Sequence, residues 1–563
     1  MTTSAETGSS DSTPDHDRRE RTTMKSRHGT MTTERPERYA KQLAGHWARK
    51  GSAGEEDGAT VIRFDTGQVV RMWPDAGLLR VEASVPEDGD ADRFAQVVKA
   101  HLERFGQREE LDVVWDQPDG DDADGVSGAD DTADGAGAGT GAGRGAGRGA
   151  RIRTIPEGFL LGVATAGHQN EGQNTNSDTW FLEHTTPSVF REPSGRACNG
   201  YELWREDIDL VKAMGLDSFR FSVEWARVEP VEGTVDEAAL DHYEAMVDRC
   251  VELGLAPVVT FNHFTSPHWF AAEGGWLGPR SAELFARYCG WVMDRFGDRI
   301  AYAVTLNEPN LPRLLSWLDL PPFVRDLERA TLEAASAAAG VERYRAGNVM
   351  VPEDMDAIGD GMTAGHRAAR AAIRSRRPDL PVGFSLAVID DRVVGDDPSF
   401  RDRKRAEVYS RWLDLAREDD FLGIQNYESR WYDGNGEVDA APGTPVNGMG
   451  SAIEPTSLAG AVRYAHAETG VPILVTEHGM QTSDDSERAA FIEPSLAALL
   501  EAMDDGVPVL GYLHWTLMDN FEWIFGYGAQ LGLHEVDRET FVRTPKPSAR
   551  AYEGIARSRR VSV

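Results

Sequence analysis

The fold of this chain is decided by two short stretches, Thr305-Leu306-Asn307-Glu308-Pro309 and Val475-Thr476-Glu477-His478-Gly479. Each one places a glutamate just after an apolar run, Ile300 to Leu306 in the first and Val471 to Val475 in the second. Short apolar runs of this kind are typical of strands buried in a parallel sheet. Carboxyl groups at the ends of such strands are typical of the catalytic face of an α/β barrel.

Six further apolar segments flank these two, and helical patterns such as Ala238 to Leu253 and Ser486 to Met503 lie between them. Strands that alternate with helices predict a parallel sheet, and eight such units predict an α/β fold closed as a (β/α)8 TIM barrel. The long gap between Glu308 and Val382 has its own helical pattern, Val324 to Ala346, which predicts an insertion over the barrel mouth. The eight predicted strands are Phe159–Val163, Ser218–Val223, Pro257–Phe261, Tyr302–Leu306, Val382–Ala387, Phe421–Gln425, Ile473–Thr476 and Val509–Leu513.

Composition divides the 563 residues into four parts. Residues 1–33 are rich in Ser, Thr, Asp and Arg without apolar periodicity, and we expect a disordered tail. Residues 34–116 predict a small α+β domain with the order α-β-β-β-α-β. Residues 117–151 are rich in Asp, Gly and Ala and predict a flexible linker. Residues 152–557 contain all eight barrel strands.

The charge of the chain excludes several partners. The net charge is −34, which argues against nucleic acid and anionic membranes, since both favour Lys and Arg. No run approaches the ~18 apolar residues of a membrane span, and the first 30 residues lack the apolar core of a secretion signal. The three cysteines form no disulfide framework and predict free thiols, so we expect a cytoplasmic protein. The oligomeric state is left open.

Polar or aromatic residues follow seven of the predicted strands, which points to one ring of side chains around one pocket. Two carboxyl groups in such a ring suit glycoside hydrolysis, in which one protonates the leaving oxygen and the other attacks or stabilises the sugar carbon. Aromatic faces and amide or carboxylate groups suit the binding of a sugar ring. The residues after the strands are His168-Gln169, Arg220, Asn262-His263, Asn307-Glu308, Gln425-Asn426-Tyr427, Glu477, and Trp515 with Asp519-Asn520-Phe521-Glu522-Trp523.

Residues 152–555 resemble glycoside hydrolase family 1, the β-glucosidase and β-galactosidase family, in segments that follow in the family's order. The resemblance implies a (β/α)8 barrel that acts on a small carbohydrate with no metal and no organic cofactor. The matching segments are Phe159 to Thr165, Phe219 to Trp225, Thr305 to Pro309, Asp420 to Ile424, Thr476 to Gly479, Asp519 to Trp523 and Lys546 to Ala549.

The resemblance also implies roles for single residues. Glu308 is expected to be the general acid/base and Glu477 the nucleophile of a double displacement that retains the anomeric configuration. Three supporting residues are implied: Asn307 at the sugar 2-hydroxyl, and Arg220 and Tyr427 at Glu477, where a cation and a hydrogen bond favour the ionised carboxylate. Gln169, His263 and Glu522 are expected to bind sugar hydroxyls, and Trp515 and Trp523 to form the platform under the ring.

Several positions depart from the family's pattern. The most prominent departures are His478 after the nucleophile, Phe264 after His263, Gln425-Asn426 before Tyr427, Leu531 near the sugar 6-position and Ser451 on the aglycone side. The glycone therefore stays open among glucose, galactose, fucose and mannose. The sequence does not name the aglycone. A carboxylate at Glu522 argues against 6-phosphosugars, because it would repel a phosphate.

Two alternatives to hydrolysis stay open. The changes around Gln425, Asn426 and His478 motivate a carbohydrate-binding or sensing protein that has lost turnover, and a further alternative is a transglycosidase that prefers an acceptor alcohol to water. The small N-terminal domain resembles a bacterial family of unknown function, through segments such as Leu43 to Trp47 and Leu111 to Trp115.

Overall fold

The chain forms two compact units, residues 1–142 and 143–563. The computed structural model describes residues 152–562 apart from 319–321, 442 and 448–449. In the first unit it describes 24–33, 35–47, 51–56, 58–64, 67–86, a few positions between 91 and 102, and 113–116. The predicted linker over residues 117–151 lies outside the described residues.

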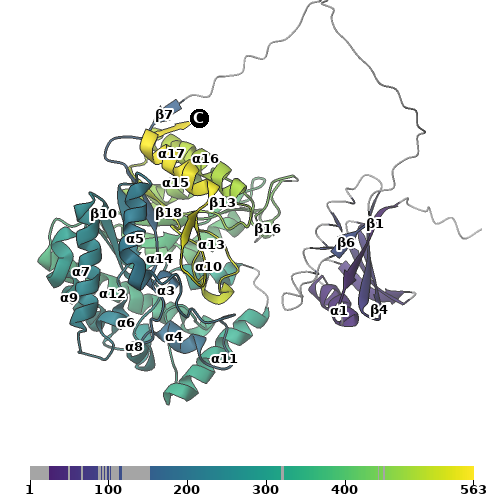
Figure 1. The fold of residues 1–563 in the computed structure, drawn as a ribbon, viewed down its shortest axis with the longest axis horizontal. Helices are drawn as coiled ribbons and strands as arrows, with labels where there is room; N and C mark the ends of the chain where they lie inside the picture. Colours follow the sequence, from purple (N-terminus) through teal and green to yellow (C-terminus); the bar gives the residue numbers. More distant parts are fainter. Residues whose placement is uncertain are drawn as a thin grey trace, which may run out of the picture. The chain divides into compact units, whose positions relative to one another are not determined.

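The second unit is built on a closed barrel of eight parallel strands, as the alternation of strands and helices predicts (Figure 1). Each predicted strand is confirmed to within two residues at its ends. Neighbours follow in chain order around the barrel, and the last strand pairs with the first. The strands are β8 (Leu160–Ala164), β9 (Ser218–Ser222), β10 (Ala256–Asn262), β11 (Tyr302–Asn307), β12 (Val382–Ala387), β14 (Leu422–Asn426), β17 (Ile473–His478) and β18 (Val509–Trp515).

Helices cover the outside of the barrel because each one presents a single apolar stripe to the sheet. In α7 (Glu237–Glu252) the buried stripe includes Leu240, Tyr243 and Val247, and the Asp236 side chain caps the first turn by accepting bonds from the amides of Ala238 and Ala239. The same pattern recurs in α5 (Gly200–Ala213), α9 (Ser281–Phe296), α12 (Met355–Arg376), α14 (Ser410–Ala416), α15 (Ser457–Thr469) and α17 (Pro547–Ser558), whereas α16 (Asp485–Asp504) is buried on all sides from Ser495 to Leu500.

The predicted insertion after β11 contains α10 (Leu311–Trp317) and α11 (Pro322–Ala339). Helix α11 ends at Ala339, whereas the predicted helical stretch extends to Ala346. Leu332 of α11 packs in a separate hydrophobic cluster with Leu182 of α4 (Asp178–Glu183) and with Phe521 of the loop after β18. The insertion therefore supports the polar loop that follows the last barrel strand.

The two ends of the barrel unit lie side by side. Strand β7 (Ile152–Thr154) pairs antiparallel with β21 (Arg560–Ser562), and both are visible near the C-terminus in Figure 1. The unit therefore extends beyond the predicted boundary at residue 557.

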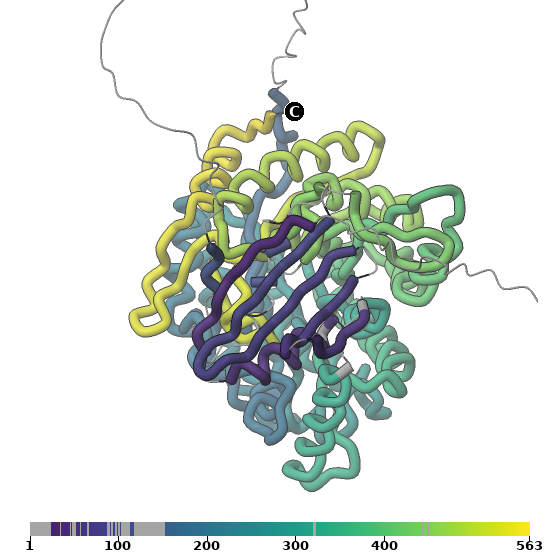
Figure 2. Tube along the Cα trace, turned by 90° about the vertical axis from the view of Figure 1, so that its right-hand side faces the viewer, coloured from purple at the N-terminus to yellow at the C-terminus, as the bar shows by residue number. Residues whose placement is uncertain are grey.

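The first unit is a six-stranded sheet covered by α1 (Pro36–His46), and its described strands appear as adjacent purple segments in Figure 2. Tyr39, Leu43 and Trp47 form the buried face of this helix. The sheet order is β2-β3-β4-β5-β1-β6, with β1 (Met24–Thr32), β2 (Gly51–Glu56), β3 (Ala59–Phe64), β4 (Val69–Asp75), β5 (Leu78–Pro86) and β6 (Val113–Trp115).

Two features of this unit correct the sequence prediction. The expected disordered tail over residues 1–33 is wrong for Met24–Thr32, because β1 pairs with β5 along all nine of its residues and buries Met31 in the core. Residues 1–23 lie outside the described residues. Strand β2, with the sequence GSAGEE, was not predicted, because Gly and Glu are poor strand formers and β2 is held at the sheet edge by pairing with β3.

No helix among the described residues is long and apolar enough to cross a membrane.

Candidate active site

Glu477 lies near the carboxyl end of β17, where two predicted partners hold its carboxylate. Arg220 Nη1 donates to Glu477 Oε1 at 2.6 Å, and the Tyr427 hydroxyl donates to Oε2 at 2.6 Å. Arg220 is fully buried on β9, so its charge has no water to screen it. Both carboxylate oxygens of Glu477 are thus occupied and their orientation is fixed.

Glu308 follows β11 and faces different surroundings. Its side chain is 7% exposed, and among the described residues no side chain or amide donates a hydrogen bond to its carboxyl group. Its backbone has a left-handed φ of 46°, a conformation that costs a non-glycine residue about 1–2 kcal/mol. Strained backbone of this kind concentrates at functional sites.

The two glutamates differ in how they hold a proton. Burial raises the pKa of both carboxyl groups. For Glu308 the negative charge of Glu477 adds to burial and holds the pKa well above its ordinary value. For Glu477 the charge of Arg220 and the hydrogen bond from Tyr427 oppose burial. A proton shared by the pair therefore resides on Glu308, and Glu477 carries the charge.

Asn307 connects this pair to its surroundings. Its Oδ1 accepts bonds from Arg220 Nη2 at 2.5 Å and from Gln425 Nε2 at 2.8 Å, and its Nδ2 lies 3.3 Å from His263 Nε2. The structure thus brings the predicted residues Arg220, Asn307 and His263 into one buried network. Gln425 belongs to it too; the sequence places it at the end of the sixth strand but assigns it no role.

Gln169 and Glu522 form a second pair of predicted site residues. Gln169 Nε2 donates to Glu522 Oε2 at 3.1 Å and to the Phe521 carbonyl at 3.0 Å. Burial raises the pKa of Glu522 to about 8, with a further contribution from the charge of Glu477. Gln169 Oε1, His263 Nδ1 and Asn520 Nδ2 are buried with no hydrogen-bond partner among the described residues. These atoms suit a ligand with several hydroxyl groups.

The two predicted platform residues lie next to this network. The His263 ring is nearly parallel to those of Trp515 and Trp523, with interplanar angles of 12° and 8° and centroid distances of 5.8 and 6.2 Å. Phe264 meets Trp523 edge-on at 5.2 Å. The contacts thus connect seven of the ten predicted site residues, Gln169 and Glu522 contact each other, and Glu308 interacts with the charges of Glu477, Arg220 and Glu522.

The departures from the family pattern fall around this ring. His478 is fully buried, and its Nδ1 lies 2.6 Å from the Asn426 carbonyl oxygen of the neighbouring strand β14. Leu531 packs in the cluster that contains Trp515. Ser451 donates a hydrogen bond to Glu428, the residue after Tyr427.

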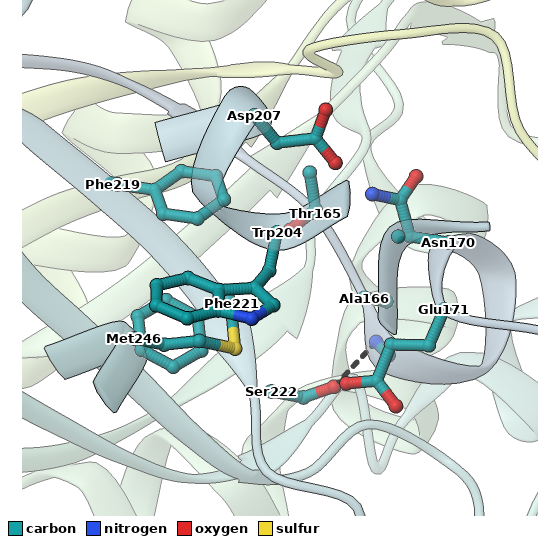
Figure 3. Close-up of a pocket in the computed structure, with 12 residues that line it drawn as sticks. Thr165, Ala166, Asn170, Glu171, Trp204, Asp207, Phe219, Phe221, Ser222 and Met246 are labelled. Carbon is teal, nitrogen blue, oxygen red and sulfur yellow. Dashed lines mark hydrogen bonds between the residues drawn. The ribbon is translucent and has the colours of Figure 1, made fainter. Parts of the chain in front are cut away.

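A separate small cavity lies between β9 and α5 (Figure 3). Its volume of about 20 Å³ is enough for a water molecule and too small for a sugar. Figure 3 shows Glu171, Ser222 and Asn170 at its wall, where the Gly167 amide donates to Ser222 Oγ at 2.7 Å. Neither Glu308 nor Glu477 lines it. Among the residues that the structure describes, no group of three or more His, Cys, Asp or Glu side chains could hold a metal ion.

Replacing Glu522 by Gln is expected to stabilise the protein at alkaline pH. A carboxyl whose folded pKa is raised contributes most stability below its unfolded pKa, and this contribution is lost as the pH rises to about 8. The amide side chain of the variant has no charge to gain on deprotonation. We expect the variant to gain on the order of 1–3 kcal/mol over the wild type between pH 5 and pH 8.5, measured by denaturant unfolding. If the difference in unfolding free energy between the variant and the wild type stays the same from pH 5 to pH 8.5, the raised pKa of Glu522 is contradicted.

A closed parallel barrel that presents two buried carboxyl groups at the carboxyl ends of β11 and β17 is the architecture of a glycoside hydrolase. The chain belongs to glycosyl hydrolase family 1, whose family model matches residues 151–344 and 407–561. Residues 28–116 match a second family, described as an uncharacterized protein conserved in bacteria.

The relatives agree with this class. A bifunctional beta-D-glucosidase/beta-D-fucosidase of Bifidobacterium breve is 30% identical over 464 residues, covering 70% of this chain and 96% of the relative. A beta-glucosidase of an Agrobacterium species is 31% identical over 448 residues, covering 71% and 95%. These matches support hydrolysis of a β-glycoside by this chain.

Two solved structures share the barrel. The crystal structure of beta-glycosidase BGL167 has a TM-score of 0.68 and 46% identity, and covers 72% of this chain and 97% of that chain. The beta-glucosidase of Thermotoga maritima in complex with deoxynojirimycin has a TM-score of 0.61 and 25% identity, and covers 72% and 99%.

Proposed function

We propose that this chain is a retaining β-glycosidase of the β-glucosidase type, which hydrolyses terminal β-linked sugars through a covalent glycosyl-enzyme. The observation that carries the proposal is the contrast between the two buried glutamates. Glu477 is held by a guanidinium and a hydroxyl, whereas Glu308 has no donor among the described residues and a pKa well above its ordinary value. An ionised nucleophile beside a protonated acid is the arrangement that retaining hydrolysis requires.

The reaction follows from this arrangement in two steps. First, a Glu477 oxygen bonds to the anomeric carbon while the bond to the aglycone oxygen breaks, and Glu308 gives its proton to that oxygen. Second, Glu308, now a carboxylate, takes a proton from water as the water oxygen attacks the anomeric carbon and releases Glu477. Each displacement inverts the carbon, so the net result is retention.

The remaining ring residues are proposed to bind the sugar. Asn307 and His263 lie next to the Glu477 partners and suit the 2- and 3-hydroxyls, while Gln169 and Glu522 suit hydroxyls farther around the ring. The unpartnered Gln169 Oε1 and His263 Nδ1 supply a buried acceptor and a ring nitrogen that a hydroxyl could satisfy. Trp515 and Trp523 supply apolar faces for the sugar's C–H groups.

The experiment that tests the proposal is hydrolysis of a panel of 4-nitrophenyl β-glycosides, with the anomer of the first-formed product followed by NMR. We expect release of the β-sugar, and the panel ranks glucose, galactose, fucose and mannose. Release of the α-sugar would overturn the retaining mechanism. Alkyl glycosides formed in preference to free sugar on addition of an alcohol would favour the transglycosidase alternative, and binding of sugars without turnover by folded protein would favour a sensing role.

Replacing Arg220 by Met is expected to damage both stability and reaction. The change removes the cation from a buried carboxylate and leaves Asn307 Oδ1 short of a donor, which costs about 3–5 kcal/mol of folding free energy. In protein that still folds, the pKa of Glu477 rises further, so the acidic limb of the kcat/KM profile moves to higher pH. A profile at the wild-type position would show that Arg220 does not set the charge of Glu477.

A cytoplasmic location stays a prediction. It is supported by the three cysteines, Cys198, Cys250 and Cys289, which are buried and unpaired.

A further inference from the structure

A buried carboxylate outside the catalytic ring, Glu183 of α4, stands at the centre of a polar network under the Trp523 loop. Its Oε1 lies 2.8 Å from His168 Nε2, and its Oε2 accepts bonds from the Ser194 amide at 2.9 Å and the Ser194 hydroxyl at 2.7 Å. The side chain is fully buried. Both oxygens are therefore committed to partners whose positions they determine.

The first arm of this network reaches Trp523 through His168. This histidine precedes Gln169 in α3 (Gly167–Asn170), and its ring lies nearly parallel to that of Trp523, with a centroid distance of 5.7 Å and an angle of 8°. Burial lowers the pKa of His168, the neighbouring Glu183 raises it, and the net direction is upward. The other acidic groups that act on His168 are Glu224 and Asp178, both buried. The ring is thus held against the indole by charge and by a directed bond.

The second arm reaches the other end of the same loop through Ser194. The Tyr527 hydroxyl donates to the Ser194 carbonyl, and the Tyr527 amide donates to Glu192 Oε1 at 3.0 Å. Between these ends, the Glu522 amide donates to the Gly526 carbonyl at 2.8 Å and closes a tight turn. Trp523 stands in this turn with a left-handed φ of 48°, so its position depends on the supports at both ends.

We propose that Glu183 is a positioning residue that sets the Trp523 face of the sugar pocket through His168 and Ser194. The inference rests on the proposed function, in which Trp523 contacts the sugar ring. Glu183 itself touches neither substrate nor reacting atoms, so its effect passes through Trp523 and falls on sugar binding. The chemistry of Glu308 and Glu477 is left intact, because among the described residues neither of them forms a hydrogen bond with this network.

The test is a double-mutant cycle on the full chain, with deoxynojirimycin as the probe and its Kd measured by calorimetry. Glu183→Gln keeps the shape of the side chain and removes its charge, and we expect a Kd about 5–10-fold weaker. Trp523→Ala is expected to raise the Kd by at least the same factor. Because Glu183 acts through Trp523, the double variant should bind no more weakly than Trp523→Ala alone. For 4-nitrophenyl β-glucoside, Glu183→Gln should raise KM and leave kcat within about 2-fold.

A matched control comes from another buried carboxylate that binds a histidine, Asp419 with His366. Asp419→Asn should lower the thermal midpoint by an amount similar to Glu183→Gln without changing the Kd for deoxynojirimycin. Tyr527→Phe removes only the hydroxyl on the second arm, and we expect it to reproduce the rise in KM in a stably folded protein. If either Glu183→Gln or Tyr527→Phe leaves the Kd unchanged, or if Glu183→Gln and Trp523→Ala have multiplicative effects, the inference is overturned.

Failure here is distinguishable from failure of the proposed function. Wild-type protein that neither turns over β-glycosides nor binds deoxynojirimycin would contradict the proposed function. If the wild type hydrolyses β-glycosides and binds deoxynojirimycin, but the effects of Glu183→Gln and Trp523→Ala on the binding free energy are additive, only the role of Glu183 is contradicted.

Discussion

Replacing Glu477 by Gln is expected to lower kcat on 4-nitrophenyl β-glucoside by about 10⁴-fold or more in protein that still folds. The amide cannot form the covalent bond to the sugar, and a loss of this size corresponds to about 5 kcal/mol of transition-state stabilisation. The Gln side chain is isosteric: its Oε1 can accept the bond from Arg220 and its Nε2 can donate to the Tyr427 hydroxyl, so the fold should persist with a lower thermal midpoint, because Arg220 loses its counter-charge. Steady-state kinetics and a melting curve on the same preparation check both expectations.

A second variant, Glu477→Gly, tests whether Glu477 is the nucleophile or only stabilises charge at the sugar carbon. Removing the side chain leaves space beside the anomeric carbon, and azide can enter it as an external nucleophile. Because one displacement replaces two, the product should be the α-glycosyl azide from a substrate with a good leaving group. Failure of azide to restore any turnover in folded Glu477→Gly, together with residual activity in Glu477→Gln, would assign the nucleophile elsewhere.

Replacing Glu308 by Gln is expected to cause a loss that depends on the leaving group. Proton donation contributes about 10²–10⁴-fold when the aglycone is a poor leaving group, and almost nothing when it leaves as a stable anion. We therefore expect a large drop in kcat/KM for an alkyl β-glucoside and a small one for 2,4-dinitrophenyl β-glucoside. Equal losses on both substrates would exclude Glu308 as the acid.

The pH profile gives an independent check on Glu308. In the wild type, activity falls as the pH rises through the raised pKa of Glu308, because the proton needed by the leaving group is lost. Activity falls on the acidic side as Glu477 becomes protonated. In Glu308→Gln with the dinitrophenyl substrate, the alkaline limb of kcat/KM should disappear and the acidic limb should stay.

The barrel could be predicted from the sequence because its strands are buried on both faces. Segments such as Val382–Ala387 and Ile473–Thr476 are short, largely apolar runs that the structure buries along their whole length. The fold of the small N-terminal domain was harder to predict. Strand β1 buries little more than Gly29 and Met31, so its pattern resembles a polar tail until its pairing with β5 is seen.

The identities of the site residues could be predicted, but their arrangement could not. Residues that follow the strands of a closed barrel must meet at one face, so Arg220, Tyr427 and Glu477 could be expected to lie together. The left-handed backbones of Glu308 and Trp523 could not be anticipated, since residues with a side chain rarely adopt this conformation. The role of Glu183 could not be anticipated either, because only the folded chain brings its carboxylate to His168.

The pairing of β7 with β21 has a mechanical consequence. Any tension transmitted to Ile152 from the preceding part of the chain falls first on this three-residue strand pair, which lies outside the closed barrel. The pair can separate while β8 keeps its bonds to β9 and β18. The strand pair β7–β21 is thus the first part of this unit that a pull on Ile152 would separate, before the force reaches the barrel strands that carry Glu308 and Glu477.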